Sequence, residues 1–174
     1  MLGANGGLIG AVRKPSGRSA SGLWFQNEQS LAKRAGNWVI PVGVYSQSSV
    51  YPGTAAASAE NMTNGSFSDT GTATNNDVNA FVMIDYGEPV FIQVVTIGTA
   101  TSAIPGGWSK TYTENKAIQT SSDNSSWTTL FNTGTFASDG IYKFYGPGNF
   151  TPVSARYIRI FGTFYVGISE FCVN

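Results

Sequence analysis

Short apolar segments, separated by polar turn residues, follow one another from residue 38 to the C-terminus. In the segment 79–85, Phe81 and Met83 alternate with Val82 and Ile84, which is the period of a β-strand covered on both faces. Clusters of Gly, Asn, Asp, Ser and Pro separate this segment from its neighbours. The pattern predicts strands at 38–45, 79–85, 91–99, 116–121, 127–131, 141–144, 155–161 and 168–173, with a turn at 87–89.

Short strands with this punctuation predict an all-β fold, an antiparallel β-sandwich of the jelly-roll type, over residues 41–174. The composition agrees, because hydrophobic residues make up 41% of the chain and can fill a core. Charged residues make up only 11%, well below the usual share of about 25%. Low charge with many Thr, Tyr and Phe is typical of a sheet protein with uncharged polar loops.

The first 40 residues differ from the rest. Residues 1–23 are rich in Gly and Ser and cannot bury enough apolar surface to order themselves. A short helix is predicted next, with Asn27 as the N-cap, Glu28 in the first turn and Gly36 at the end. We therefore predict that residues 1–40 form an extended N-terminal arm with one short helix, which docks on a partner.

The charge pattern and the apolar runs exclude several classes of protein. The formal net charge is zero and no stripe of Lys and Arg exists, so nucleic acid is not expected as a partner. No apolar run approaches the length of a membrane span or a signal peptide. Cys172 is the one cysteine, which rules out an internal disulfide and predicts a buried thiol and folding in a reducing compartment.

The residue types needed for most catalytic sites are missing. The sequence contains no histidine, which removes Ser-His-Asp and Cys-His arrangements and histidine-ligated zinc. The Gly-rich residues 3–10 neither follow a strand nor open a helix, as a phosphate-binding loop must. Two carboxylates alone would suffice for a glycosidase, but the few acidic residues lie mostly at turns and strand ends. We expect a protein that is not an enzyme.

Four stretches, in this order, resemble the discoidin family, also called coagulation-factor C-type domains, within the galactose-binding-like jelly rolls. They are Phe81-Val82-Met83-Ile84-Asp85-Tyr86-Gly87, Ile118 to Trp127 with Ser121-Ser122-Asp123-Asn124, Ala155-Arg156-Tyr157-Ile158-Arg159-Ile160, and Ile168-Ser169-Glu170-Phe171. In this family the third segment is an Ala-Arg-Tyr-x-Arg strand and the second is a hairpin that ends in Trp. The resemblance implies a binding domain with the predicted sandwich fold.

The resemblance places a ligand site in the loops at one end of the sandwich, where aromatic faces and polar donors hold sugars. The loop 101–113 is the strongest candidate, because Trp108 lies in a long loop between Gly-Gly and Ser-Lys and is expected to be more exposed than a core Trp. We name Trp108, Lys110, Tyr112 and Tyr165 as candidate ligand-binding residues. The alternative is that Trp108 caps the end of the sandwich or lies in a subunit contact.

Many relatives hold a structural calcium ion near the entrance of the sandwich. Calcium takes several oxygen ligands, and Asn64, Asp69 and Glu170 are the candidate donors in this sequence. Asn64 stands where the family commonly has an acidic residue. Calcium is accordingly the one cofactor that the resemblance suggests.

Two arginines and a tryptophan of the resembling segments are also expected to have structural roles. Arg156 and Arg159 are expected to form ion pairs, with Asp85 or Glu170 as partners, and ligand binding is the alternative. Trp127, just inside the strand that returns from the hairpin, is expected to cover the core.

The N-terminal arm itself resembles a leader of tailed-bacteriophage structural proteins. The resemblance rests on Gly6-Gly7-Leu8-Ile9-Gly10, Ser19 to Trp24, Asn27-Glu28-Gln29 and Ala35-Gly36-Asn37-Trp38. It implies a virion protein that contacts other virion proteins through residues 1–40 and forms a homo-oligomer. The alternative is that these residues wrap their own sandwich or swap between identical subunits.

These resemblances together suggest a tail fibre, appendage or baseplate adhesin that binds a host-surface glycan. A purely structural capsid decoration or cement protein is the main alternative. A cellular carbohydrate-binding module fits the leader less well.

Overall fold

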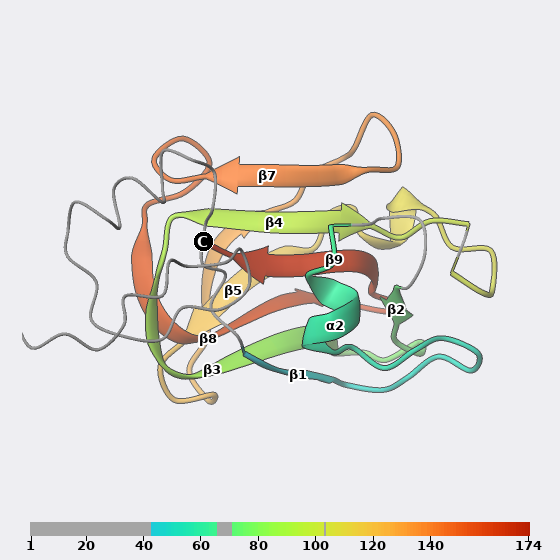
Figure 1. Ribbon diagram of the computed structural model, residues 1–174, viewed down its shortest axis with the longest axis horizontal. Coiled ribbons are helices and arrows are strands. Elements are labelled where there is room, and N and C mark those ends of the chain that lie inside the picture. The colour runs from blue at the N-terminus through green and yellow to red at the C-terminus, as the bar shows by residue number, and fades with distance from the viewer. Residues whose placement is uncertain (1–42, 66–70, 103) are drawn as a thin grey trace, which may run out of the picture. The chain divides into compact units, whose positions relative to one another are not determined.

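The computed structural model describes residues 43–65, 71–102 and 104–174, which form a sandwich of two antiparallel β-sheets (Figure 1). This confirms the predicted fold class. The predicted arm and helix of residues 1–40, and the candidate ligand Asp69, lie outside the described residues.

The larger sheet has five strands in the order β1-β3-β8-β5-β6. Neighbouring strands in this sheet all pair in antiparallel fashion. The strands are β1 (Val44–Gln47), β3 (Ala80–Ile92), β8 (Val153–Gly162), β5 (Ala117–Ser121) and β6 (Thr128–Asn132).

The smaller sheet has four strands in the order β2-β9-β4-β7. They are β2 (Thr72–Ala73), β9 (Gly167–Val173), β4 (Val94–Thr99) and β7 (Ile141–Tyr145). The loops that connect these strands form the two ends of the sandwich.

Every second side chain of the central strands points into the space between the sheets and fills it. In β3, Val82 and Ile84 are fully buried, and in β8 Ile158 and Ile160 pair with them from the neighbouring strand. Phe171 of β9 is a fully buried side chain contributed by the other sheet. Burial of these side chains stabilises the fold by about 1.5–3 kcal/mol each, so the period-two pattern of the sequence determines which face of each strand points inward.

The predicted turn at 87–89 is wrong, because β3 continues without reversing direction. The pairing of β3 with β8 shifts between Asp85 and Val90, and Gly87 adopts a φ of 77° within this irregularity. Asp85 accepts a hydrogen bond from the Gly87 backbone N–H at 2.7 Å and so stabilises the bend. A bulge absorbs the extra residues while the strand continues, and the chain crosses to the other sheet only after Ile92.

The sequence pattern did not predict three short elements. They are the strand β2, the 3-10 helix η1 (Lys110–Tyr112) and the helix α2 (Ala59–Met62). Ser58 is the N-cap of α2: its side chain accepts from the Asn61 backbone N–H, and the Asn61 side chain accepts from the Ser58 N–H. Elements of this length are too short to show a period.

Candidate functional site

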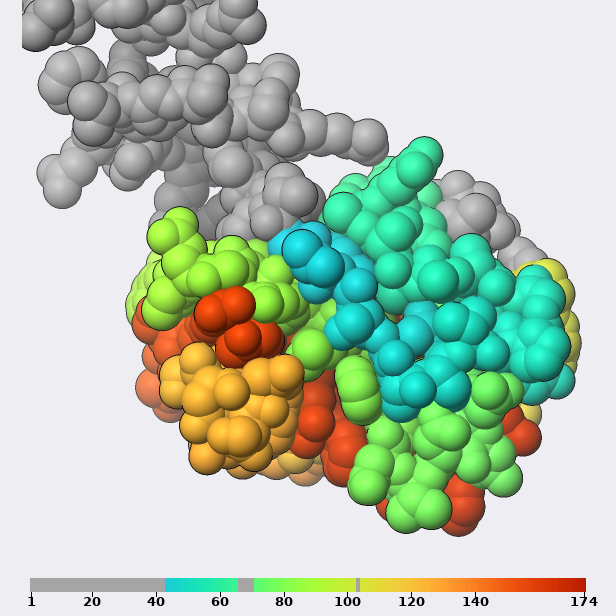
Figure 2. Space-filling model, turned by 90° about the horizontal axis from the view of Figure 1, so that it is seen from below, coloured from blue at the N-terminus to red at the C-terminus, as the bar shows by residue number. Residues whose placement is uncertain are grey.

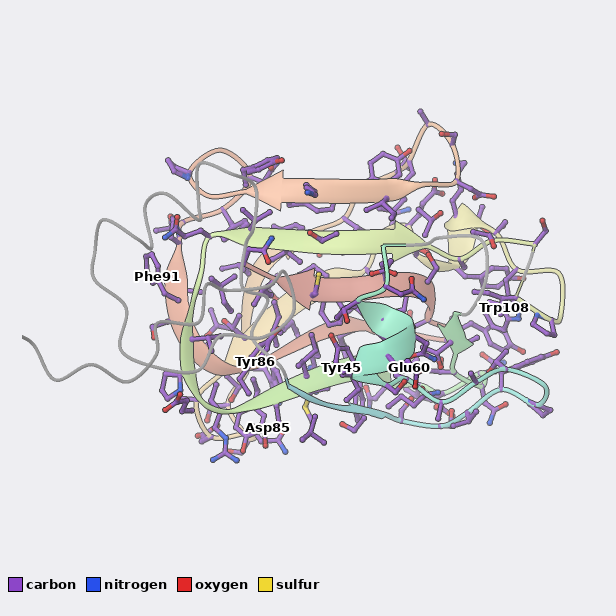
Figure 3. The ribbon with its side chains drawn as sticks, in the orientation of Figure 1. Tyr45, Glu60, Asp85, Tyr86, Phe91 and Trp108 are labelled. Carbon is purple, nitrogen blue, oxygen red and sulfur yellow. The ribbon has the colours of Figure 1, made fainter. Side chains whose placement is uncertain are left out.

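Three connecting segments meet at the end of the sandwich where Trp108 lies (Figure 3). They are the β1–β2, β4–β5 and β8–β9 connections, and we call the surface that they form the loop end. The backbone N–H of Tyr51 donates to the Ala73 carbonyl at 2.8 Å, and the N–H of Phe164 donates to the Asp77 carbonyl at 2.8 Å. The first bond ties the β1–β2 connection to strand β2, and the second ties the β8–β9 connection to the segment between β2 and β3.

Trp108 lies at the centre of the loop end and is buried, with only 4% of its surface exposed. The expectation that it is more exposed than a core tryptophan is therefore wrong. Its ring contacts those of Tyr51, Tyr112 and Tyr165, with centroid distances of 5.1, 4.5 and 5.5 Å. Its indole N–H donates to the Pro105 carbonyl at 3.0 Å, so Trp108 caps the end of the sandwich.

Two glycines explain how the large indole fits in this loop. A Cβ atom on Gly106 would lie 2.7 Å from the indole nitrogen, and one on Gly167 would lie 2.7 Å from Cε3 of the ring. Gly106 also has a φ of 115°, a conformation that only glycine adopts at low cost. Gly106 before Trp108 and Gly167 in β9 are therefore packing requirements for the indole.

A buried threonine ties the β4–β5 connection to strand β9. The Thr113 hydroxyl accepts from the Ala100 N–H at 2.8 Å and donates to the Gly167 carbonyl at 2.7 Å. The Thr133 hydroxyl in turn donates to the Thr113 carbonyl at 3.0 Å. Buried polar groups that are fully bonded make a structure rigid, so the loop end has a preformed shape.

The three tyrosines around Trp108 present polar groups at the surface. Tyr51, Tyr112 and Tyr165 are half-buried, and their hydroxyls have no hydrogen-bond partner among the described residues. None of these hydroxyls is among the buried atoms that lack a partner, so they reach solvent. A phenol hydroxyl both donates and accepts hydrogen bonds, which suits a ligand rich in hydroxyl groups.

Lys110 lies at the start of η1 and is partly committed to another residue. Its ammonium group forms an ion pair with Glu114 at 2.6 Å, and its backbone N–H donates to Asp139 at 3.0 Å. The hydrogen bond from Lys110, together with one from the Phe136 N–H, lowers the pKa of Glu114. The Lys110 side chain is 29% exposed, and an ammonium group has three N–H donors, so it can donate to a ligand at the edge of the loop end as well as to Glu114.

Sequence reasoning missed Phe164, the most exposed aromatic side chain of the loop end. It is 59% exposed and has a φ of 64°, a left-handed conformation that is strained for a bulky residue. It directly precedes Tyr165 in the β8–β9 connection. An alternating pattern does not extend into a loop, so only the flanking Gly162 and Gly167 indicated that this segment turns sharply.

Two of the three candidate metal ligands, Asn64 and Glu170, are among the described residues. Glu170 is 2% exposed in β9, and it accepts a hydrogen bond from the Gly65 N–H at 2.9 Å. The fold thus brings Asn64, the neighbour of Gly65, close to the Glu170 carboxylate. A buried carboxylate with amide and carbonyl oxygens nearby suits calcium, and these two residues would hold the ion. The described residues contain no group of three or more acidic, Cys or His side chains that would hold a metal.

One of the two expected arginine ion pairs is confirmed. Arg156 binds Asp85 through two hydrogen bonds, at 2.8 and 2.9 Å, and the pair lowers the pKa of Asp85. Arg159 does not pair with Glu170, because the two residues lie in different sheets. Instead it donates to Gln119 at 2.9 Å on the outer face of the five-stranded sheet.

Trp127 does not cover the core as expected. Its ring centroid lies 3.8 Å from the guanidinium carbon of Arg159, on the same outer face. Cys172, in contrast, is buried as predicted, and burial raises the pKa of its thiol to about 11. Over the described ranges, no helix has the length and apolarity to cross a membrane.

Comparison with known proteins identifies the architecture. The family model described as F5/8 type C domain matches residues 44–171. No curated protein sequence is significantly similar to the chain.

Three solved structures illustrate the structural likeness. The lectin domain of lectinolysin complexed with Lewis B antigen has 19% identity and a TM-score of 0.59, covering 76% of this chain and 92% of that chain. A Streptococcus pneumoniae fucose binding module has 16% identity and a TM-score of 0.56, with coverages of 74% and 88%. A CBM32 module from Clostridium perfringens in complex with GalNAc-β-1,3-galactose has 13% identity and a TM-score of 0.56, with coverages of 75% and 94%. At these identities the likeness shows the fold alone.

Proposed function

Because the chain belongs to the F5/8 type C domain family, we propose that it is a carbohydrate-binding protein whose ligand site is the loop end. The observation that carries this proposal is the exposed, strained Phe164 beside a rigid cluster of tyrosines that present unpaired hydroxyls. Strained residues persist where the surrounding structure fixes them, and they concentrate at functional sites.

Each part of the loop end has a distinct task in this proposal. The Phe164 ring provides an apolar face for the C–H groups of a pyranose. The hydroxyls of Tyr112 and Tyr165 exchange hydrogen bonds with sugar hydroxyls, and Lys110 donates at the edge. Trp108 contacts no sugar but holds the tyrosines in place from below. Binding of this kind needs little rearrangement, which limits its entropic cost.

The structural neighbours support the ligand class. Two of them are complexes with the Lewis B antigen and with GalNAc-β-1,3-galactose, and a third is called a fucose binding module. They do not identify the sugar that this chain binds, because their sequences are less than 25% identical to it. The absence of histidine from the sequence agrees with a site that binds without catalysing a reaction.

A matched pair of phenylalanines tests the proposed site. Phe164 is 59% exposed at the loop end, and Phe91 is 58% exposed at the opposite end of the sandwich, where Figure 3 labels it. A glycan array would first select ligands for the intact protein. F164A should then weaken binding at least about 5-fold, which corresponds to about 1 kcal/mol. F91A should leave the affinity unchanged. Equal affinities of the two variants would contradict the proposal.

We further propose that the protein works on a bacteriophage particle, as a tail fibre, appendage or baseplate adhesin. The support is the resemblance of residues 6–38 to a leader of phage structural proteins. In this proposal the arm docks on other virion proteins and the sandwich binds the host-surface glycan. The intact protein should then compete with phage particles for adsorption to host cells, and F164A should compete less well.

A capsid decoration or cement protein remains the alternative for the same leader. In that case the protein would copurify with virions but would not compete for adsorption. Mass spectrometry of purified particles, combined with the adsorption assay, separates the two roles. Absence of the protein from the particles would contradict both.

A further inference from the structure

The outer face of the five-stranded sheet carries a group of aromatic side chains around one arginine. Phe81 of β3 and Phe161 of β8 lie opposite each other in the ladder, and Trp127 precedes β6. In Figure 2, which looks at the molecule from below, β3 in green, β8 in red and the β5–β6 turn in orange lie next to one another. All three aromatic side chains are half-buried, and Arg159 lies among them.

The aromatic rings and one amide hold the Arg159 guanidinium in a fixed position. Its central carbon lies 3.8 Å from the Trp127 centroid, 4.5 Å from that of Phe161 and 5.9 Å from that of Phe81. Its Nε–H donates to the Gln119 side chain, which is itself bonded to Thr129 at 3.3 Å. The flexible arginine side chain has therefore already lost much of the freedom that a ligand would otherwise have to restrict.

The terminal nitrogens of this guanidinium remain available. Arg159 uses only Nε within the part of the chain that the structure describes, and no carboxylate there lies within ion-pair distance of it. Arg156, three residues earlier, is in the opposite situation, because Asp85 occupies its Nε and one terminal nitrogen. The sheet thus carries one arginine that is neutralised and one that is not.

We propose that Arg159 and the surrounding rings form a second carbohydrate subsite, which binds the carboxylate of a uronic acid residue. The two terminal nitrogens of a guanidinium match the two oxygens of a carboxylate. Phe161 and Phe81 provide apolar surface for the pyranose ring that carries this carboxylate. Charge complementarity selects the acidic sugar, since neutral sugars gain little from an unpaired cation. The subsite shares only its ligand class with the loop end and lies on a different surface.

Binding of oligogalacturonate hexamers to the intact protein tests this inference. R159Q should weaken binding at least about 10-fold relative to the unmodified protein, and R159K should restore only part of it because an ammonium group lacks the planar fork. K143Q is the matched control, because Lys143 is an exposed cation on strand β7 of the other sheet. It should bind as tightly as the unmodified protein, and thermal melting should show that all variants are folded.

The outcomes also separate this subsite from the loop end. F164A should reduce binding of array-selected neutral glycans and leave oligogalacturonate binding unchanged, whereas R159Q should do the reverse. Failure of the intact protein to bind oligogalacturonate, or equal binding by R159Q and K143Q, would overturn the subsite. Loss of oligogalacturonate binding in F164A alone would move acidic sugars to the loop end and would also refute the inference.

Discussion

Replacement of Trp108 by alanine should unfold the loop end rather than remove a ligand contact. The indole is 4% exposed, touches three tyrosine rings and donates one hydrogen bond. Truncation of a buried Trp to Ala typically costs about 3–5 kcal/mol. The hydrogen bond to Pro105 contributes about 1 kcal/mol of this, and each ring pair contributes about 0.5–1.5 kcal/mol. We expect W108A to lower the free energy of unfolding by about 4 kcal/mol.

Urea unfolding followed by far-UV circular dichroism measures this loss without depending on tryptophan fluorescence. With a denaturant slope of about 2 kcal/mol/M for a domain of this size, the midpoint should fall by about 2 M. W127A is the matched control, because Trp127 is half-buried and stacks on the Arg159 guanidinium. A cation–π contact of this kind is worth about 0.5–2 kcal/mol, so the midpoint of this variant should fall by less than half as much.

One outcome would contradict a structural role for Trp108. If W108A unfolded at the same urea concentration as the unmodified protein and yet lost glycan binding, the tryptophan would be a ligand residue. The description of Trp108 as the support beneath the tyrosines would then be wrong.

Three further predictions concern other parts of the fold. T113V should destabilise the protein by about 2 kcal/mol, because it leaves two buried backbone groups without partners, whereas an equal midpoint in urea would show that the loop end is not fixed by this hydroxyl. Arg156 holds the pKa of Asp85 below its ordinary value, so the pair stabilises the fold above the unfolded pKa of about 4 and this contribution disappears as the pH falls below that value. R156Q should therefore weaken the fall of the melting temperature with falling pH. An unchanged fall would rule out this ion pair as its cause. If Glu170 helps to hold calcium, millimolar calcium should raise the melting temperature by several degrees, chelation should reverse the rise and E170Q should not show it, whereas no response to calcium would remove that site.

The sequence predicted the sandwich because its strands are long enough to show alternation. Val82 and Ile84 point inward and are fully buried, as their period predicts. The bulge after Asp85 was predicted to be a turn, because Gly and Pro, here Gly87 and Pro89, occur in turns as well as in bulges. Only the pairing with β8, which resumes at Val90, distinguishes a bulge from a reversal, and that information is not local.

The sequence named some of the residues that gather at the loop end but not how they are arranged. Tyr112 and Tyr165 do meet around Trp108, although they come from different loops. The burial of Trp108 was missed because it depends on Tyr51, which is distant in the sequence. Phe164 was missed because exposure in a loop is set by the backbone conformation, here a φ of 64°. Ligand binding by these residues stays a prediction.

Glycan binding by the intact chain and by the phenylalanine variants decides whether the loop end is the carbohydrate site. We predict that F164A, at the loop end, loses at least about 5-fold in affinity for array-selected glycans, and that F91A, at the other end, loses nothing. Binding that is equal in the two variants, or lost in F91A instead, would contradict the assignment of the loop end as the carbohydrate site.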